Sequence, residues 1–263
     1  MRTHQIIVII VGVLLVIFLY QLPRVAVEND VITDVMPHEL NVSDADNEVI
    51  ISLRNQIGSS SSKEKSINFA DSLASVYLKY QLVDSAEAYA RLVLNLDSSF
   101  FGRYRAGMIY YKAFQTASDE KKAAGLGSKT RDILERLMLE DSSNMSLRNK
   151  FAMTLVVSEN PMQGIMMLRE ILEQEPENRE AIFNLGLLAI RSGQMDRARD
   201  RFIKLIEMNE SDHEAHFYLG VVYVETGESA EGIKTFKRYL EFEEANKALK
   251  ATASNYIKEL ESI

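Results

Sequence analysis

The chain has 263 residues, 46% of them hydrophobic, which suffices for one sizeable array or one to two compact domains. It contains no cysteine, and this excludes disulfides, thiolate metal sites and cysteine nucleophiles. The formal net charge of −8 argues against nucleic acid as a partner and against docking of the soluble part on anionic lipid, because both require clustered lysine and arginine.

The first predicted element is a membrane anchor. Residues 6–22 read IIVIIVGVLLVIFLYQL without a charge, and 17 residues at about 1.5 Å each span roughly 25 Å, the short end of a transmembrane helix. The alternative is a cleaved secretory signal, but no small-x-small cleavage site follows the segment. We therefore expect residues 1–22 to be a short tail and a retained transmembrane anchor.

The orientation of this anchor is set by only two basic residues. Arg2 precedes the segment and Arg24 follows it, so the two flanks differ little in positive charge and the charge difference favours neither orientation strongly. A short inside tail with the remainder exported is the preferred arrangement. In a bacterium the chain would then be a single-pass inner-membrane protein whose C-terminal domain lies in the periplasm.

Residues 23–62 are predicted to be an acidic and serine-rich spacer that contains a short helix. The part up to residue 43 is polar and includes Pro23 and Pro37, which favours an extended chain. Asp44 or Asp46 is expected to cap a helix that ends near Ile57. The glycine and serine run at 58–62 should break this helix and act as a flexible joint.

The C-terminal half repeats itself with a period of 34 residues. Superimposing 179–212 on 213–246 matches, among others, Leu185 with Leu219, Gly186 with Gly220, and Phe202 with Phe236. Self-similarity at this period is typical of stacked helix-turn-helix units, each of which buries its apolar faces only against its neighbours.

Small residues give a second test of this repeat, because two antiparallel helices approach closely only where both carry small side chains. Four pairs of small residues are each 12 positions apart: Ala74 and Ala86, Ala152 and Gly164, Gly186 and Ala198, Gly220 and Gly232. This spacing predicts one close contact within each helix pair.

The pattern resembles the tetratricopeptide repeat family over residues 63–263. The small residues follow large apolar ones such as Leu185 and Leu219, aromatic Phe202 and Phe236 occupy the second helix, and Pro176 sits between units. The resemblance implies an all-α, TPR-like helical-hairpin solenoid preceded by the transmembrane helix. The expected array covers 63–246, with units at 67–100, 101–144, 145–178, 179–212 and 213–246, and a capping helix at 247–263.

The second unit departs from the pattern. Its first helix is expected at 104–116, an insertion at 119–128, and its second helix at 130–140. Within the insertion, Gly125 and Gly127 precede Lys129 in a run that superficially suggests a phosphate loop. Ser128 interrupts the required Gly-Lys-Ser/Thr sequence, so we interpret the run as a flexible loop with Ser128 or Thr130 capping the next helix.

No constellation of residues predicts catalysis, a cofactor or a metal site. His213 and His216 are three residues apart, which differs from the zinc-protease spacing, and no third ligand is evident; we interpret His216 as structural. The helical spacing of Met162, Met166 and Arg169 fits core packing better than an adaptable methionine surface. The chain is therefore not expected to be an enzyme.

In the family that the chain resembles, the first helix of each unit lines a concave groove. The groove positions implied for the last three units are Asn149, Met153, Val156, Phe183, Leu187, Ile190, Phe217, Val221 and Val224. Most are apolar, with Glu180 and Glu214 at the rim, which suits an apolar helical or extended segment with a basic flank better than an acidic C-terminus. Alternatively, neighbouring helices or a self-association partner cover some of them.

The sequence therefore predicts a membrane-tethered scaffold that binds a protein or peptide and assists assembly or maturation in the periplasm. The layout resembles two bacterial groups: ancillary proteins of the translocon that hold emerging chains, and repeat proteins of cytochrome c maturation that present apocytochrome for haem attachment. A structural protein that self-associates into a homo-oligomer is the alternative from a different class.

Overall fold

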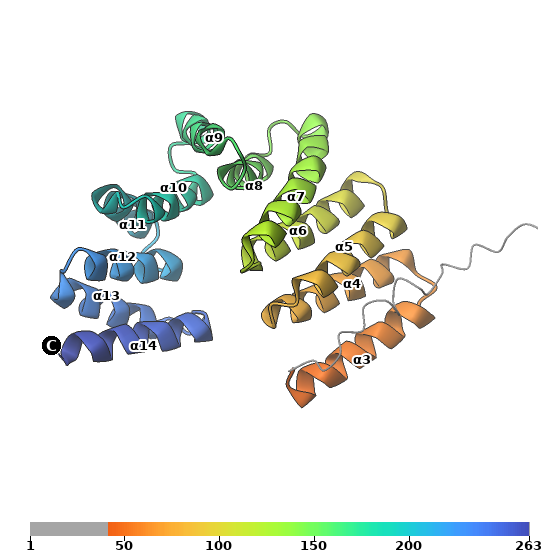
Figure 1. Cartoon of the computed structure of the whole chain (residues 1–263), viewed down its shortest axis with the longest axis horizontal. Helices are drawn as coiled ribbons and strands as arrows, with labels where there is room; N and C mark the ends of the chain where they lie inside the picture. The colour runs from red at the N-terminus through yellow and green to blue at the C-terminus, as the bar shows by residue number, and fades with distance from the viewer. Residues whose placement is uncertain (1–41, 263) are drawn as a thin grey trace, which may run out of the picture. The chain divides into compact units, whose positions relative to one another are not determined.

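The computed structural model describes residues 42–262, which form twelve α-helices, α3 to α14 (Figure 1). The predicted all-α class is confirmed over this range. The predicted anchor at 6–22 and the spacer up to residue 41 lie outside the described residues. No helix between residues 42 and 262 is long and apolar enough to cross a bilayer. The chain divides into two compact units, up to Asp97 and from Ser98 onward.

The N-terminal unit consists of α3 (Asp44–Ser59), α4 (Lys63–Lys79) and α5 (Val83–Leu96). The predicted short helix is α3, but Ser43 caps it in place of Asp44 or Asp46, and it continues through Gly58 to Ser59. Ile50 and Ile57 are buried where α3 packs against α4. This helix therefore belongs to the packed unit and is not an isolated part of a spacer.

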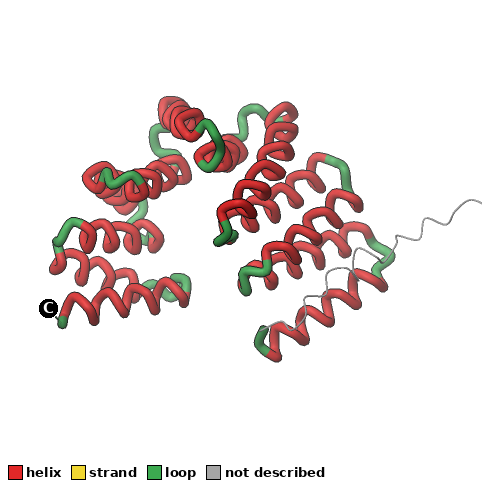
Figure 2. Tube along the Cα trace, viewed as in Figure 1, coloured by secondary structure: helices red, strands yellow, loops and turns green. Residues whose placement is uncertain are grey.

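The C-terminal unit is a series of antiparallel helices in which each packs against the next along the chain (Figure 2). Short loops join them, as the helical-hairpin pattern predicts. The helices are α6 (Phe100–Thr116), α7 (Glu120–Glu140), α8 (Met145–Val156), α9 (Pro161–Gln174), α10 (Arg179–Arg191), α11 (Met195–Met208), α12 (His213–Glu225), α13 (Ser229–Glu241) and α14 (Lys247–Glu261).

The insertion predicted at 119–128 is wrong, because these residues form the first part of the 21-residue helix α7. Asp119 caps the helix, and Thr130 donates its hydroxyl to the carbonyl oxygen of Leu126 within it. Of the two glycines that suggested a loop, Gly125 has nothing within 4 Å of an added Cβ, whereas Gly127 packs against α6, where a Cβ would lie 3.4 Å from the Phe114 ring. Packing has overridden the low helix propensity of glycine here.

Two of the predicted contacts between small residues are confirmed, Ala152 with Gly164 and Gly220 with Gly232, where a Cβ at Gly232 would lie 3.7 Å from the Gly220 carbonyl oxygen. A Cβ at Gly164 would lie 2.4 Å from the carbonyl oxygen of Ala152. A Cβ at Gly186 would lie 2.8 Å from the Phe202 ring, and one at Gly220 would lie 2.7 Å from the Phe236 ring. Each of these glycines therefore lets a second helix approach its partner.

The first helices also share a polar cap that recurs every 34 residues. Asn144, Asn178, Asp212 and Asn246 accept hydrogen bonds from backbone N–H groups at the starts of α8, α10, α12 and α14. A cap at the first turn satisfies N–H groups that have no partner within the helix. These caps fix where each first helix begins, and so where the residues on its face lie.

Candidate partner-binding face

The nine positions predicted to line a groove lie on α8, α10 and α12. On each helix they are separated by four and then three residues, which places them on one side of the helix. Seven of them are half-buried; we call these seven the first-helix face. They are Met153, Val156, Phe183, Leu187, Ile190, Val221 and Val224.

Asn149 is not part of an open surface, since it is 0% exposed. Its Nδ2 donates to the carbonyl oxygen of Met145 at 3.0 Å and to Oδ1 of Asn178 at 3.1 Å. Asn178 Oδ1 in turn caps α10 through the N–H of Ala181. Asn149 therefore ties one helix pair to the next and cannot contact a partner in this conformation.

Phe217 is also buried, with 4% of its surface exposed. Its ring centroid lies 5.2 Å from that of Tyr239 and 5.8 Å from that of Phe236. Ala253 and Ile257 of the terminal helix α14 belong to the same cluster. The alternative considered above, that neighbouring helices cover some groove positions, is thus confirmed for Asn149 and Phe217.

Two aromatic rings form the centre of the first-helix face. The Phe183 centroid lies 5.4 Å from that of Tyr218, edge to face, and the Arg179 guanidinium lies 4.8 Å above the Phe183 ring. Tyr218 was not predicted, because the residue 34 positions earlier is Asn184 and the repeat gives no signal for an aromatic there. Burial, and then the nearby Glu214 carboxylate, raises the pKa of the Tyr218 hydroxyl.

The rim of this face is charged but internally paired. Arg179 donates from Nε and Nη2 to both carboxylate oxygens of Asp212 at 2.8 Å, and from Nη2 to Glu214 at 2.7 Å. Burial alone would raise the pKa of Asp212, but the Arg179 bonds and the Ala215 N–H hold it below its usual value. Glu180 pairs with Lys150 at 2.9 Å. Lys150 therefore neutralises Glu180, whereas Arg179 is shared between Asp212 and Glu214 and leaves a net negative charge there, so the basic flank on the partner stays a prediction.

Val156 and Val224 turn partly toward the second helices of their own pairs. A Cβ at Gly164 would lie 2.9 Å from a Val156 methyl group, and one at Gly232 would lie 3.3 Å from a Val224 methyl group. These two valines contribute less to the surface than their position on the helix predicts. Met153, Phe183, Leu187, Ile190 and Val221 make up the rest of the face.

The polar residues that could have suggested chemistry have structural surroundings. His216 is 8% exposed, packs against the Phe242 ring at 5.3 Å and has Nε2 3.1 Å from the carbonyl oxygen of Glu210. Between residues 42 and 262, no three His, Asp or Glu side chains are grouped so as to hold a metal ion.

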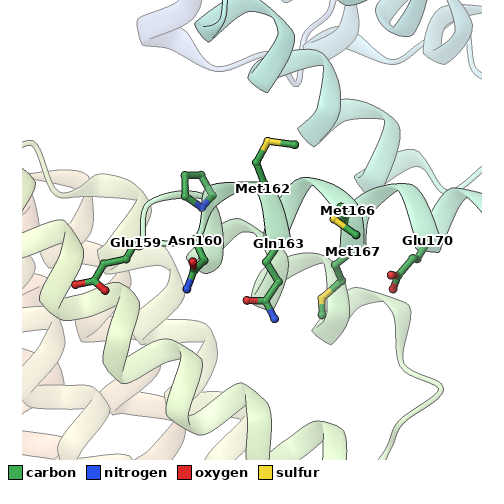
Figure 3. Close-up of a pocket in the computed structure, with 8 residues that line it drawn as sticks. Glu159, Asn160, Met162, Gln163, Met166, Met167 and Glu170 are labelled. Atoms are coloured by element: carbon green, nitrogen blue, oxygen red, sulfur yellow. The ribbon is translucent and has the colours of Figure 1, made fainter.

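The prediction that Met162 and Met166 pack in the core is wrong. They are 58% and 55% exposed on α9 and line an open groove of about 700 Å³; Met167 also lines this groove but is partly buried against the core cluster. Figure 3 shows Met162 on the opposite side of α9 from Gln163 and Met167. Helical spacing identified one face of α9 correctly but not which face points to solvent.

Comparison with known proteins matches one family over part of the chain. The family model described as Tetratricopeptide repeat matches residues 149–202 and 183–248, which lie within α8 to α14. The search of curated protein sequences found no match.

Solved structures of similar fold include YrrB, described as a TPR protein with an unusual peptide-binding site. It is 21% identical, with 81% of this chain and 98% of that chain covered and a TM-score of 0.43. A crystal structure of MamA is 20% identical, covering 55% of this chain and 92% of that chain with a TM-score of 0.40. MamA from Desulfovibrio magneticus RS-1 is 13% identical, with 58% and 94% covered and a TM-score of 0.41.

Proposed function

We propose that the chain binds an apolar protein or peptide segment along α8, α10 and α12, since residues 149–248 match the tetratricopeptide repeat, a scaffold family that is typically non-enzymatic. Stacked helical repeats present extended surfaces of this kind because corresponding helices of successive units lie side by side. The proposed contacts are the first-helix face together with Tyr218.

One observation carries this proposal: half-buried apolar side chains occupy corresponding positions on three successive first helices. Leu187, Phe183 and Tyr218 all pack against the core cluster that joins α10 to α12, and Val221 occupies the position of α12 that corresponds to Leu187. A partner that completes the burial of such side chains gains about 25 cal/mol for each Å² of apolar surface removed from water. The rim charges are only partly compensated, which favours a mainly apolar partner with a modest basic flank.

The test is peptide selection against the full-length protein in detergent, followed by affinity measurement with fluorescence anisotropy. Selected peptides should be rich in large apolar residues. Leu187→Gln should weaken them roughly thirtyfold, since truncating a desolvated anchor commonly costs about 2 kcal/mol. The matched control is Leu139→Gln, because Leu139 is 83% exposed on α7, away from this face. Equal loss in both variants, or in neither, would remove the first-helix face as the binding surface.

The membrane tether belongs to the same proposal and rests on the uncharged segment 6–22. A bacterial source would then have the repeats in the periplasm, held at the inner membrane. Full-length protein should resist alkaline extraction, and its mature mass should include the first residues. A mature N-terminus beyond about residue 25 would contradict the anchor, and a reporter fused after Ile263 that is active only in the cytosol would reverse the orientation.

Self-association is the alternative use of the same face, since a second copy could cover the apolar side chains. Light scattering on the full-length protein distinguishes the two: a monomer that binds selected peptides supports the client-binding role. A stable oligomer that Leu187→Gln dissociates supports self-association. Two more specific roles stay predictions: that the chain holds proteins emerging from the translocon, and that it presents apocytochrome for haem attachment. Identification of the partner will test both.

A further inference from the structure

Three arginines from two second helices converge on one small pocket. Arg169 of α9 and Arg197 and Arg201 of α11 line a pocket of about 140 Å³ between α9, α10 and α11. Its other walls are mostly apolar and include Met162, Ile165 and Leu188. The pocket thus combines three guanidinium groups with hydrocarbon walls.

None of these three arginines forms an ion pair with a carboxylate among residues 42–262, although the chain as a whole is acidic. Arg197 donates from Nη1 to Oε1 of Gln194 at 2.6 Å, and Nε2 of Gln194 donates to the Ser192 hydroxyl at 2.7 Å. This chain of neutral hydrogen bonds holds Arg197 at the pocket without neutralising it.

Arg201 lies close enough to the other two arginines to feel their charges. Burial, and then the charges of Arg169 and Arg197, lower the pKa of Arg201, while the neighbouring Asp200 offsets part of the effect. Arginines elsewhere in the unit differ, since the pKa of Arg179 is raised by Asp212. An anion placed among the three guanidinium groups would relieve their repulsion.

We propose that this arginine pocket binds an acidic peptide segment, with one carboxylate between Arg169, Arg197 and Arg201 and an adjacent apolar side chain against Met162 and Leu188. Guanidinium groups bind carboxylates in a bidentate, planar geometry, which suits a side-chain carboxylate. The apolar walls favour a peptide over a free inorganic anion. Met162 also lines the open groove along α9 that Figure 3 shows, so the pocket and the groove share this side chain.

This site goes beyond the proposed function because it uses the second helices α9 and α11, together with a different side of α10. Leu188 lines the pocket, whereas Leu187, the next residue, belongs to the first-helix face. The two sites can be tested independently.

The experiment measures anisotropy of a fluorescein-labelled hexapeptide, Leu-Glu-Leu-Asp-Leu-Glu with an amidated C-terminus, on the full-length protein in detergent. A second peptide carries Gln and Asn in place of the acidic residues. We expect the acidic peptide to bind at least tenfold more tightly than the neutral one and to weaken with added salt. Excess inorganic phosphate should compete only weakly, because it makes no apolar contact.

Arg201→Gln should weaken the acidic peptide at least tenfold without lowering the melting temperature, because it removes a like charge from the cluster. Arg136→Gln makes the same change in net charge at an exposed position of α7 and should bind as the wild type does. Leu187→Gln should also bind normally, which separates this result from the first-helix face. Equal affinity for both peptides, unchanged binding by Arg201→Gln, or phosphate competing as well as the peptide does would each overturn the proposal.

Discussion

At the scale of single residues, the turns within helix pairs depend on one backbone conformation. Gly193 and Gly227 have φ of 72° and 79° at corresponding places, and Gln81 has φ of 58° in the α4–α5 turn. In each turn the next residue donates its N–H to a carbonyl five positions earlier, as Gln194 does to Ala189. For a non-glycine residue this left-handed conformation costs roughly 1–2 kcal/mol of conformational free energy.

Replacing a glycine and replacing a non-glycine residue at this turn position should have opposite effects on stability. Gly193→Ala should lower the free energy of unfolding by about 1 kcal/mol, although nothing lies within 4 Å of the added Cβ. Gln81→Gly should raise it by about 0.5 kcal/mol, because the relieved strain exceeds the added entropy of the unfolded chain. Urea unfolding measures both. Loss of stability in Gln81→Gly would show that its side chain matters more than its φ.

Gly220 tests a second residue-scale requirement, the absence of a side chain at a helix contact. Gly220→Leu should lower the free energy of unfolding by about 1–3 kcal/mol, since even a Cβ would lie 2.7 Å from the Phe236 ring. Glu225→Gln, at an exposed position near the end of the same helix, is the control and should change little. Thermal unfolding followed by circular dichroism gives the comparison, and equal melting temperatures would contradict the close packing.

At the scale of elements, α3 is held to α4 by a pH-sensitive contact. Hydrogen bonds from Lys79 and Tyr80 lower the pKa of Asp46 from 3.8 to about 2. Because the folded-state pKa is lowered, the contact stabilises the unit fully above about pH 4 and is lost as the pH falls toward 2. Amide exchange in α3 should therefore accelerate over this range.

Asp46→Asn removes the titrating group and should abolish this part of the pH dependence, whereas Asp44→Asn on the same helical turn should preserve it. A carboxyl titration by NMR checks the cause directly. A midpoint for Asp46 near its ordinary value would mean that Lys79 and Tyr80 do not hold the carboxylate in solution.

The same scale shows what sequence reasoning can reach. The 34-residue repeat predicts the positions of α8 to α13 correctly, because contacts such as Gly186 with Phe202 require the same residue types at the same spacing in successive units. It fails at α7, where Gly127 is helical only because α6 supplies a packing partner. It also fails for Asn149 and Phe217, whose burial depends on Asn178 and on α14 outside their own helices. The arginine pocket leaves no sequence signal, because its residues are brought together by packing between α9 and α11.

At the scale of the whole molecule, the C-terminal unit is a one-dimensional array in which helices contact mainly their neighbours in sequence. The free energy of unfolding of such an array is approximately the sum of the stability of each repeat and of the interfaces between adjacent repeats. A change at one end should therefore destabilise the nearest helices most and distant helices least. Here α14 is the terminal interface. It covers Phe217 and stacks Tyr256 on Phe236 with centroids 5.2 Å apart.

A chain that ends at Asn246 should therefore lose protection locally. Amide exchange in α12 and α13 should quicken at least tenfold, corresponding to about 1.4 kcal/mol, because the aromatic side chains that α14 covers become exposed. Exchange in α8 and α9 should change little, since two helix pairs separate them from the new end. Hydrogen exchange with mass spectrometry resolves these helices, and Tyr256→Ala in the full-length chain should give the same pattern more weakly. An equal loss from α6 to α13 would mean that the array unfolds as one cooperative body and that α14 stabilises all of it.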